Sequence, residues 1–294
     1  MIPYEIIMIG HLSKDVIIDY IGNKTYITGG AVVYSSMAAA HSEVSTMVIT
    51  KMRSDDRMLI APLQSKDIEW VTAVSPKTTS IQNVYHIADK ERRDVTLLSQ
   101  ADPFRMEDMP EDVPWVYQLA GLFGGEIPDT LIKPLALRSQ VALDAQGVLR
   151  CIDEQGSLVF HDWVNKRELL PYVTFFKVDA AEAEILTGMS DRVQAAKTLQ
   201  AWGADEVMLT HNTEVLVCGD GDIYSAPFTN SNTSGRTGRG DTTFGAYLVW
   251  RGKHDIHQSL RYAAALCSIK MESPGPFCGS VDEVLHRMEQ DRNR

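Results

Sequence analysis

The sequence predicts an α/β fold in which one doubly wound, mainly parallel sheet is flanked by helices and accompanied by a small β sheet. Short apolar runs alternate with amphipathic segments, nearly without interruption from residue 105 onward, which is typical of the strands and helices of a parallel sheet. The 294 residues are 44% hydrophobic and 23% charged, an ordinary globular composition that supports a large core without disulfides. We expect residues 1–294 to form one domain.

The main sheet is predicted from short apolar runs, and the helices from apolar residues at helical spacing. One helix has both ends marked, because it begins at Asp191 and is followed by Gly203. The expected strands are Glu5–Ile9, Ser45–Thr50, Trp115–Leu119, Val141–Asp144, Thr174–Val178 and Glu206–Thr210. The expected helices are Ala31–Ala40, Asp129–Leu137, Ala180–Leu186, Asp191–Trp202, Asp241–Trp250, Ile256–Met271 and Ser280–Gln290.

Two β-rich stretches, residues 14–28 and 76–99, interrupt this alternation. The first contains Gly22-Asn23, a hairpin signal, and the second contains a charged turn at residues 88–93. Four strands from two separate places are expected to form a small antiparallel sheet apart from the main one. The alternative is a pair of long surface hairpins.

Charge and cysteine usage exclude several classes of protein. The formal net charge is −11, which argues against nucleic acid and anionic membranes as partners, because both require a basic surface. No apolar run approaches the length that spans a bilayer. The four cysteines include no CxxC pair, which favours free thiols in a reducing compartment. The N-terminus lacks a signal-peptide pattern, so we expect a cytoplasmic protein.

The most informative stretch runs from Ser234 to Ala246. A small, polar, glycine-containing segment precedes Asp241, and an amphipathic run follows it. This layout exposes backbone N–H groups at a helix N-terminus, where they can bind an anion, and Gly238 and Gly240 let a phosphate approach closely. Asp241 is either a functional carboxylate or merely an N-cap. The GxxxxGK[ST] pattern of a P-loop is absent.

This stretch resembles the second signature of the ribokinase-like (PfkB) family of carbohydrate and nucleoside kinases. The family's Gly-Ala-Gly-Asp falls on Gly238, Arg239, Gly240 and Asp241. The resemblance implies a ribokinase-like fold in which Asp241 is the catalytic base and residues 238–241 form the anion hole for the transferred phosphoryl group. The family's leading Asp-Thr falls on Gly235-Arg236, so the resemblance does not carry over the monovalent-cation site that the family builds there.

The two arginines of this stretch set the chain apart from the family pattern. Arg239 either turns inward and binds phosphate oxygens or turns outward as a solvated side chain. Arg236 is expected to tie the loop to a neighbouring carboxylate, replacing what a bound cation would do.

The resemblance also assigns an acceptor site. Asp15, in the opening motif after the first strand, would bind substrate hydroxyls, although taken alone it is a typical solvated turn acid. Gly29 and Gly30 match the family's first glycine pair. Tyr34 stands where the family usually has Asn, which favours a ring-shaped acceptor such as a cyclic polyol or nucleoside. Asp144 is expected near the phosphates or the acceptor.

The donor site follows from the same resemblance. Asp179 and Glu182 match the family's NxxE motif and would order Mg²⁺, although Glu182 taken alone is typical of a helix surface. Thr210 begins the nucleotide loop, in which both glycines of TxGxxG are missing. The segment 273–277, which includes Pro274 and Gly275, would line the adenine pocket.

These observations predict an ATP- and Mg²⁺-dependent kinase that phosphorylates a hydroxyl of a small sugar, polyol or nucleoside, with a lid at about residues 14–28 and 76–99. Phosphoryl transfer of this kind depends on positioning and charge neutralisation. A homodimer is left open. The alternative is a non-catalytic sugar- or nucleotide-binding module with the same fold. A nicotinamide oxidoreductase is disfavoured, because GxGxxG does not follow the first strand.

Overall fold

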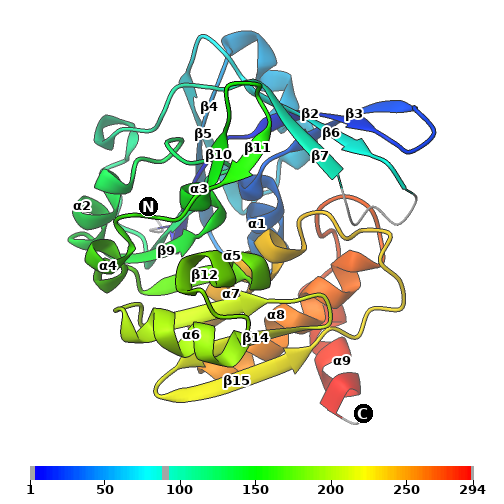
Figure 1. Cartoon of the computed structure of the whole chain (residues 1–294). Coiled ribbons are helices and arrows are strands. Elements are labelled where there is room, and N and C mark those ends of the chain that lie inside the picture. The colour runs from blue at the N-terminus through cyan, green and yellow to red at the C-terminus, as the bar shows by residue number, and fades with distance from the viewer. Residues whose placement is uncertain (1–3, 88–92, 293–294) are drawn as a thin grey trace.

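The computed structural model describes residues 4–87 and 93–292. Its centre is a nine-stranded sheet with helices on both faces (Figure 1) and the strand order β15-β14-β13-β12-β9-β8-β1-β4-β5. In chain order these strands are β1 (Ile6–Ile9), β4 (Thr46–Met52), β5 (Ile68–Val74), β8 (Val116–Leu119), β9 (Gln140–Asp144), β12 (Phe175–Asp179), β13 (Glu206–Thr210), β14 (Glu214–Gly219) and β15 (Asp222–Pro227).

All neighbouring strands from β13 to β5 are parallel, and only β14 and β15 add antiparallel pairs at one edge. The predicted mainly parallel α/β fold is therefore confirmed. The expected runs did not include β5, β14 or β15, which lie toward the two edges of the sheet. Strand β5 has mixed, half-exposed positions, so it lacks the continuous apolar run of a central parallel strand.

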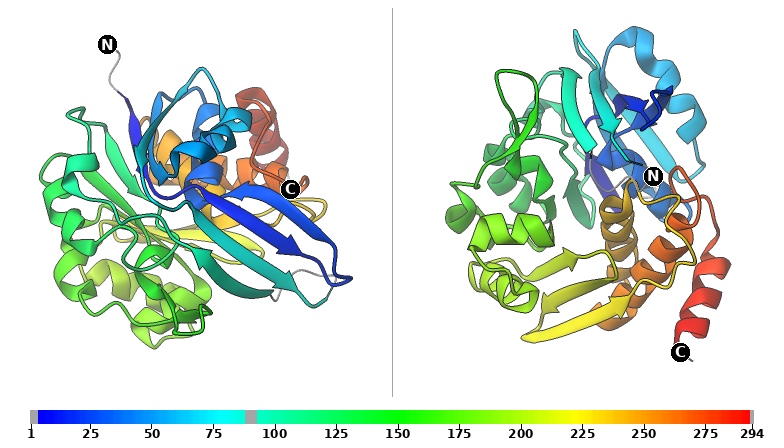
Figure 2. Two further views of the ribbon diagram at one scale, coloured as in Figure 1. Left: turned by 90° about the horizontal axis from the view of Figure 1, so that it is seen from above. Right: turned by 45° about the vertical axis from the view of Figure 1, so that its right-hand side comes forward.

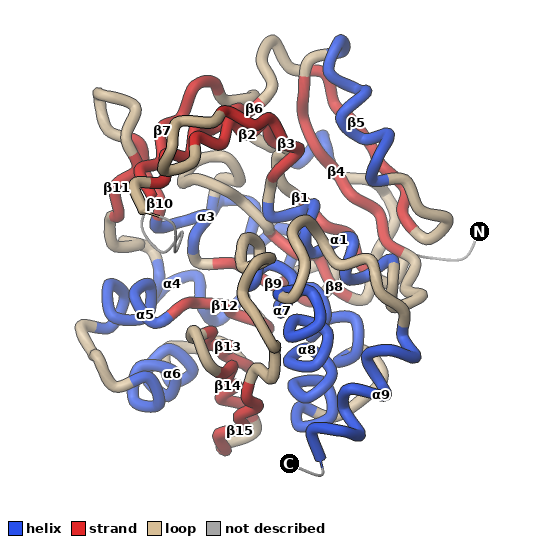
Figure 3. The backbone as a smooth tube through the Cα atoms, turned by 90° about the vertical axis from the view of Figure 1, so that its right-hand side faces the viewer, coloured by secondary structure: helices blue, strands red, loops and turns tan. Residues whose placement is uncertain are grey.

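Side chains of alternate strand residues enter two separate cores, one on each face of the sheet. In β1, Ile6 and Met8 pack in the first core, whereas Ile7 and Ile9 pack in the second, as the two-residue repeat of a strand requires. Helices α1 (Ala31–Ala40), α7 (Arg239–Arg251) and α8 (Ile256–Met271) contribute to the first core, with α9 (Val281–Arg292) outside them (Figure 3). Helices α2 (Ile132–Ala136), α5 (Ala180–Thr187) and α6 (Arg192–Ala201) contribute to the second.

A four-stranded sheet of order β3-β2-β6-β7 projects from the main body (Figure 2). Its strands are β2 (Ser13–Ile18), β3 (Lys24–Gly29), β6 (Thr79–Tyr85) and β7 (Arg93–Ser99). The expectation of a purely antiparallel sheet was wrong, because β2 and β6 are parallel. Strand β2 follows β1 in the chain, and β6 follows β5. Because β1 and β5 run in the same direction in the main sheet, β2 and β6 leave that sheet in the same direction. Except for Arg93, the expected turn at 88–93 lies outside the described residues.

The remaining elements are short. They include the hairpin β10 (Arg150–Ile152) and β11 (Leu158–Phe160), helices α3 (Gln146–Leu149) and α4 (Lys166–Leu169), and the 3₁₀ segments Ser54–Leu63, Met106–Asp108, Asp129–Leu131 and Leu170–Tyr172. A bridge between Thr96 and Ser157 joins the small sheet to the β10–β11 hairpin. Within residues 4–87 and 93–292, no helix is both long and apolar enough to cross a membrane.

Candidate active site

A cavity of ≈ 1090 Å³ lies between the small sheet and the N-terminus of α7. It brings together most of the residues that the sequence singled out, although they are far apart in the chain. The predicted residues that line it are Asp15, Gly30, Tyr34, Asp179, Thr210, Gly238, Arg239, Gly240, Asp241 and Pro274. Because the carboxyl ends of β12 and β13 open into it, it occupies the place where open α/β sheets bind ligands.

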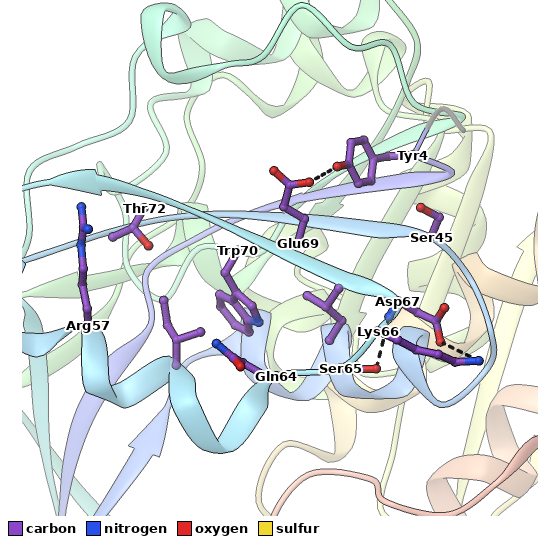
Figure 4. A pocket seen from close by; sticks show the side chains of 12 residues that line it. Tyr4, Ser45, Arg57, Gln64, Ser65, Lys66, Asp67, Glu69, Trp70 and Thr72 are labelled. Atoms are coloured by element: carbon purple, nitrogen blue, oxygen red, sulfur yellow. Dashed lines mark hydrogen bonds and ion pairs between the residues drawn. The ribbon is translucent and has the colours of Figure 1, made fainter. Parts of the chain in front are cut away.

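A second cavity, of ≈ 910 Å³, follows the edge strand β5 and contains none of the predicted residues. Among its polar side chains, the Tyr4 hydroxyl donates to Glu69, and the Lys66 ammonium lies 4.0 Å from Asp67 (Figure 4).

The N-terminus of α7 forms the floor of the larger cavity. Gly238 precedes the helix in the left-handed conformation (φ 77°), which favours glycine. Its carbonyl accepts the first helical bond, from the Thr242 N–H at 2.9 Å. Helix geometry leaves the N–H groups of Gly240 and Asp241 without an acceptor inside the helix, and both residues line the cavity. Backbone donors and a carboxylate thus share one surface, as an anion hole with an adjacent base requires.

Asp15 and Tyr34 line the same cavity next to this surface, and the Tyr34 ring contacts Gly238. The Ser13 hydroxyl donates to Asp15 at 2.7 Å, and burial raises the pKa of the Asp15 carboxyl. Gly29 makes room for that carboxylate, because a Cβ there would stand 2.4 Å from Asp15 Oδ2. Burial and the nearby Asp15 raise the pKa of Tyr34, so its hydroxyl is a neutral hydrogen-bonding group at physiological pH. A carboxyl and a phenol in contact with one cavity suit a ligand with several hydroxyls.

A buried charge cluster lies behind the floor of the cavity. The Lys177 ammonium is 3.0 Å from Asp144 and 3.9 Å from Glu182. Despite burial, which alone would lower it, the surrounding carboxylates hold the pKa of Lys177 above its ordinary value. Burial raises the pKa values of Asp144 and Glu182. Asp144 therefore positions Lys177, which lines the cavity, and is not itself among the residues that line it.

Asp179 and Glu182 form a capping box at the start of α5. Asp179 Oδ1 accepts from the Glu182 N–H, and Glu182 Oε2 accepts from the Asp179 N–H, both at 2.8 Å. Glu182 is only 1% exposed, so it is not the surface residue that its Ala-rich context alone indicates. Its second oxygen, Oε1, is buried without a hydrogen-bond partner.

This carboxylate pair is compatible with Mg²⁺ in one particular way. In the described part of the chain, no group of three or more His, Cys, Asp or Glu residues could hold a metal by itself. Asp179 lines the cavity, and Glu182 Oε1 accepts no hydrogen bond, although it lies 3.9 Å from the Arg150 guanidinium. Mg²⁺ commonly binds through one or two carboxylates together with waters and phosphate oxygens, and these residues fit that arrangement.

Cationic side chains gather around the anion-binding surface. Arg93, Arg150 and Lys177 line the cavity together with Arg236 and Arg239, and the sequence reasoning missed the first three as site residues. A lysine inside the otherwise apolar strand β12 is a signal that could have identified Lys177. Arg93 and Arg150 carry no such signal, because their place depends on how the two sheets meet.

The loop before α7 is fastened to the β13–β14 turn through Asn212. Its Oδ1 accepts from Arg236 at 3.1 Å and from Arg239 at 3.0 Å. This contact ties the loop to an amide oxygen. The expectation that Arg236 also ties it to a carboxylate stays a prediction. Arg239 is half-buried, lines the cavity and lies over the Phe228 ring at 6.0 Å, so it is not a solvated side chain.

The segment expected to line an adenine pocket is only partly at the cavity. Pro274 lines it, whereas Gly275 is not among the lining residues. Phe277 is 2% exposed and packs edge-on against His41 at 5.7 Å. The aromatic ring of this segment therefore belongs to the core and offers no face to a nucleotide base.

Comparisons with known proteins point in one direction. The profile of the pfkB family of carbohydrate kinases matches residues 5–279. A cytidine kinase of Thermococcus kodakarensis is 26% identical over 257 residues, covering 83% of this chain and 87% of that protein. An inositol 3-kinase of Zea mays is 29% identical over 233 residues, covering 74% of this chain and 57% of the relative.

Solved structures add a comparison of the whole fold. A pyrophosphate-dependent kinase of the ribokinase family, complexed with a pyrophosphate analog and myo-inositol, superposes with a TM-score of 0.87. It is 36% identical, and the match covers 96% of this chain and 99% of that one. An Arabidopsis thaliana ribokinase complexed with ribose and ATP has a TM-score of 0.78 at 16% identity, covering 98% and 99% of the two chains. The second likeness concerns the fold alone.

Proposed function

Because this chain belongs to the pfkB family of carbohydrate kinases, we propose that it transfers a phosphoryl group from pyrophosphate to a hydroxyl of a cyclic polyol of the myo-inositol type. Family membership and the kinases among its relatives identify it as a phosphotransferase that acts on hydroxyl groups, which answers the alternative of a non-catalytic binding module. The proposal concerns the donor, the acceptor and the residues that serve them.

The observation that carries the proposed donor is the arrangement around Asn212. The turn that corresponds to the family's nucleotide loop lacks both glycines and is fastened by Asn212 to Arg236 and Arg239. With Arg150 and Lys177, these residues surround the α7 N-terminus with positive charge, which suits a compact, highly charged diphosphate. Phe277, the aromatic residue of the segment expected to line an adenine pocket, is buried and presents no face to a base. The sequence alone favoured ATP. The 36% identity to a pyrophosphate-dependent kinase supports pyrophosphate as the donor instead.

The acceptor is proposed from the part of the cavity that borders the small sheet and α1. Asp15 and Tyr34 provide a carboxyl and a phenol, and Asn83 and Arg93 of the small sheet face the same space. A ring carrying hydroxyls could pack against the aromatic face while its hydroxyls bond to these polar groups. The inositol kinases among the similar proteins support this class of acceptor.

The chemical step then needs few groups. The acceptor hydroxyl oxygen attacks one phosphorus of pyrophosphate, its proton passes to the Asp241 carboxylate, and the bond to the second phosphoryl group breaks to release orthophosphate. The N–H groups of Gly238, Gly240 and Asp241 and the guanidinium of Arg239 neutralise the charge on the transferred group, whereas the Arg239 N–H donates to the Arg236 carbonyl at 3.2 Å. Mg²⁺ near Asp179 and Glu182 would neutralise the charge of the diphosphate. The small sheet would act as a lid that excludes water, which otherwise competes with the acceptor.

A matrix of donors and acceptors tests this proposal. Pyrophosphate, ATP and tripolyphosphate are each combined with myo-inositol, ribose, fructose 6-phosphate and cytidine, and ³¹P NMR follows the products. We expect pyrophosphate with myo-inositol to give an inositol monophosphate and orthophosphate at the highest rate. Faster turnover with ATP would overturn the donor, and cytidine or fructose 6-phosphate as the best acceptor would overturn the acceptor. Asp241→Asn serves as the inactive control.

A further inference from the structure

Lys270, near the end of α8, lies directly behind the anion-binding loop. It is 3% exposed, and its ammonium donates to the backbone carbonyls of Gly235 and Thr237. The same ammonium lies 5.1 Å from the centre of the Tyr34 ring. A buried, positively charged group thus contacts the loop from the side opposite the cavity.

The surroundings of this ammonium favour a positive charge. The carbonyls of Gly235 and Thr237 turn toward it, and the C-terminal end of α8 adds the negative end of a helix dipole. The Gly235 N–H donates to Met271 O at 2.8 Å, which keeps the loop on this helix end. Although burial lowers the pKa of Lys270 to about 8, against the influence of Cys267 and Asp241, the group carries its charge at neutral pH.

The family builds a monovalent-cation site at this loop, and the residues here do not fit one. Gly235 stands where the family has Asp, and a Cβ at this position would lie 1.8 Å from Ser273 O and 2.7 Å from Lys270 O. No carboxylate side chain can therefore enter at position 235. The Lys270 ammonium already occupies the space between the carbonyls that would otherwise coordinate an ion.

The trans peptide between Thr237 and Gly238 explains how the Lys270 contact can orient a backbone N–H group at the cavity. The carbonyl of Thr237 and the N–H of Gly238 belong to the same planar peptide group and point in opposite directions. A cation that holds the Thr237 oxygen on the α8 side therefore turns the Gly238 N–H toward the cavity. We infer that Lys270 is a built-in replacement for a bound monovalent cation, a positioning residue that fixes the anion-binding loop and makes the enzyme independent of K⁺. The inference about turnover rests on the proposed function.

Two variants separate charge from space. Lys270→Ala removes the ammonium and leaves room for an ion, whereas Lys270→Met removes the charge but fills the space. We expect both to lower kcat by roughly 10²-fold in Na⁺, the scale for one misplaced oxyanion donor. K⁺ or NH₄⁺ should restore at least tenfold to Lys270→Ala and nothing to Lys270→Met. Wild-type turnover should be equal in K⁺, Na⁺ and tetramethylammonium at constant ionic strength.

Thermal unfolding gives a readout that does not depend on turnover. K⁺ should raise the Tm of Lys270→Ala relative to Na⁺, and leave wild type and Lys270→Met unchanged. Lys24→Ala is the control, because Lys24 also lies over a tyrosine ring, that of Tyr26 at 5.4 Å, but is exposed on β3 and away from the loop; it should show no K⁺ effect. If no donor and acceptor support turnover, the proposed function fails, while this measurement still decides the cation replacement.

Three results would overturn the inference. They are strong activation of the wild type by K⁺, near-wild-type kcat in a folded Lys270→Met variant, and a folded Lys270→Ala variant on which K⁺ has no effect. Should Lys270→Ala not fold, the wild-type and Lys270→Met measurements still decide.

Discussion

A Cβ added to Gly238 would stand 2.2 Å from Cδ1 of Tyr34. The first residue of the anion-binding loop and the aromatic ring of the proposed acceptor site are therefore in direct contact. A glycine is required at 238 for space as well as for its positive φ of 77°. In the proposed mechanism, this contact would couple the position of the transferred phosphoryl group to that of the attacking hydroxyl.

Gly238→Ala tests this coupling. The left-handed backbone alone costs about 1–2 kcal/mol with a Cβ, and displacing the Tyr34 ring should move the reacting groups apart, so we expect kcat to fall on the order of 10²-fold. The test is a double-mutant cycle with Tyr34→Ala, measured by urea unfolding. Without the ring, Gly238→Ala should destabilise less, by a coupling of roughly 0.5–3 kcal/mol. Strict additivity would contradict the contact.

Asp241→Asn tests the proposed base. The amide keeps the shape of the side chain but cannot take the hydroxyl proton, so kcat should fall by roughly 10²–10⁴-fold with little change in either KM. Asp255→Asn is the control, because Asp255 is also a carboxylate at a helix N-terminus, where it caps α8 through the Gln258 N–H at 2.7 Å, whereas Asp241 lies in the first turn of α7. Asparagine caps helices equally well, so this control should keep its turnover. A near-wild-type kcat in Asp241→Asn would contradict the proposal that Asp241 is the catalytic base.

Arg239→Ala tests the positive side of the donor site. Removing a guanidinium that binds phosphate in both the ground state and the transition state should raise the donor KM and lower kcat together, by about tenfold or more overall. Arg261→Ala, on α8, removes a guanidinium bonded to Met288 O at 2.8 Å and lies outside the site, so it should leave both constants unchanged. Unchanged donor kinetics in Arg239→Ala would show that its contact with Asn212 is only structural.

The sequence predicted the parts of this site whose signals are local. The helix beginning just before Asp241 and the glycines that precede it are encoded within a few neighbouring residues, and the structure has α7 from Arg239 to Arg251. The opening strands and the mainly parallel sheet follow from the alternation of apolar runs in the same way.

Features that depend on packing between distant segments were not predictable in this way. Lys270 is 35 positions from Gly235 in the chain, and within its helix it reads as an ordinary basic residue near the C-terminus. The parallel pairing of β2 with β6 follows from the direction of β1 and β5 in the main sheet. Arg93 enters the cavity only because that small sheet projects over α7.

The small sheet should become more rigid when both substrates bind. Asp15, Asn83 and Arg93 reach the cavity from this sheet, so an acceptor that contacts them should hold it against α7. We expect slower hydrogen exchange of the β2 and β6 amides with myo-inositol plus a non-hydrolysable pyrophosphate analog. The edge strand β5, outside the cavity, is the internal reference. Equal exchange in β2 and β6 with and without ligands would mean that the sheet does not close over the acceptor.

The buried ammonium of Lys270 should give activity and stability opposite dependences on pH. The groups that face it are Cys267 on α8, Asp241 on α7 and Tyr34 on α1, and burial raises the pKa of Cys267 to about 11, so that thiol stays neutral below that pH. As pH rises through about 8, the pKa of Lys270, the ammonium loses its charge and kcat should fall. The ordinary pKa of a lysine is 10.5. Between pH 8 and 10.5, Lys270 is therefore protonated in the unfolded chain but not in the native state, so the free energy of unfolding should rise with pH. The difference between wild type and Lys270→Met isolates this residue: the difference in unfolding free energy should increase from pH 8 to 10, while the ratio of their kcat values should shrink. Two results together would contradict a charged Lys270 behind the anion-binding loop. They are a wild-type kcat that does not fall up to pH 9.5, and a difference in unfolding free energy between wild type and Lys270→Met that is the same at pH 8 and pH 10.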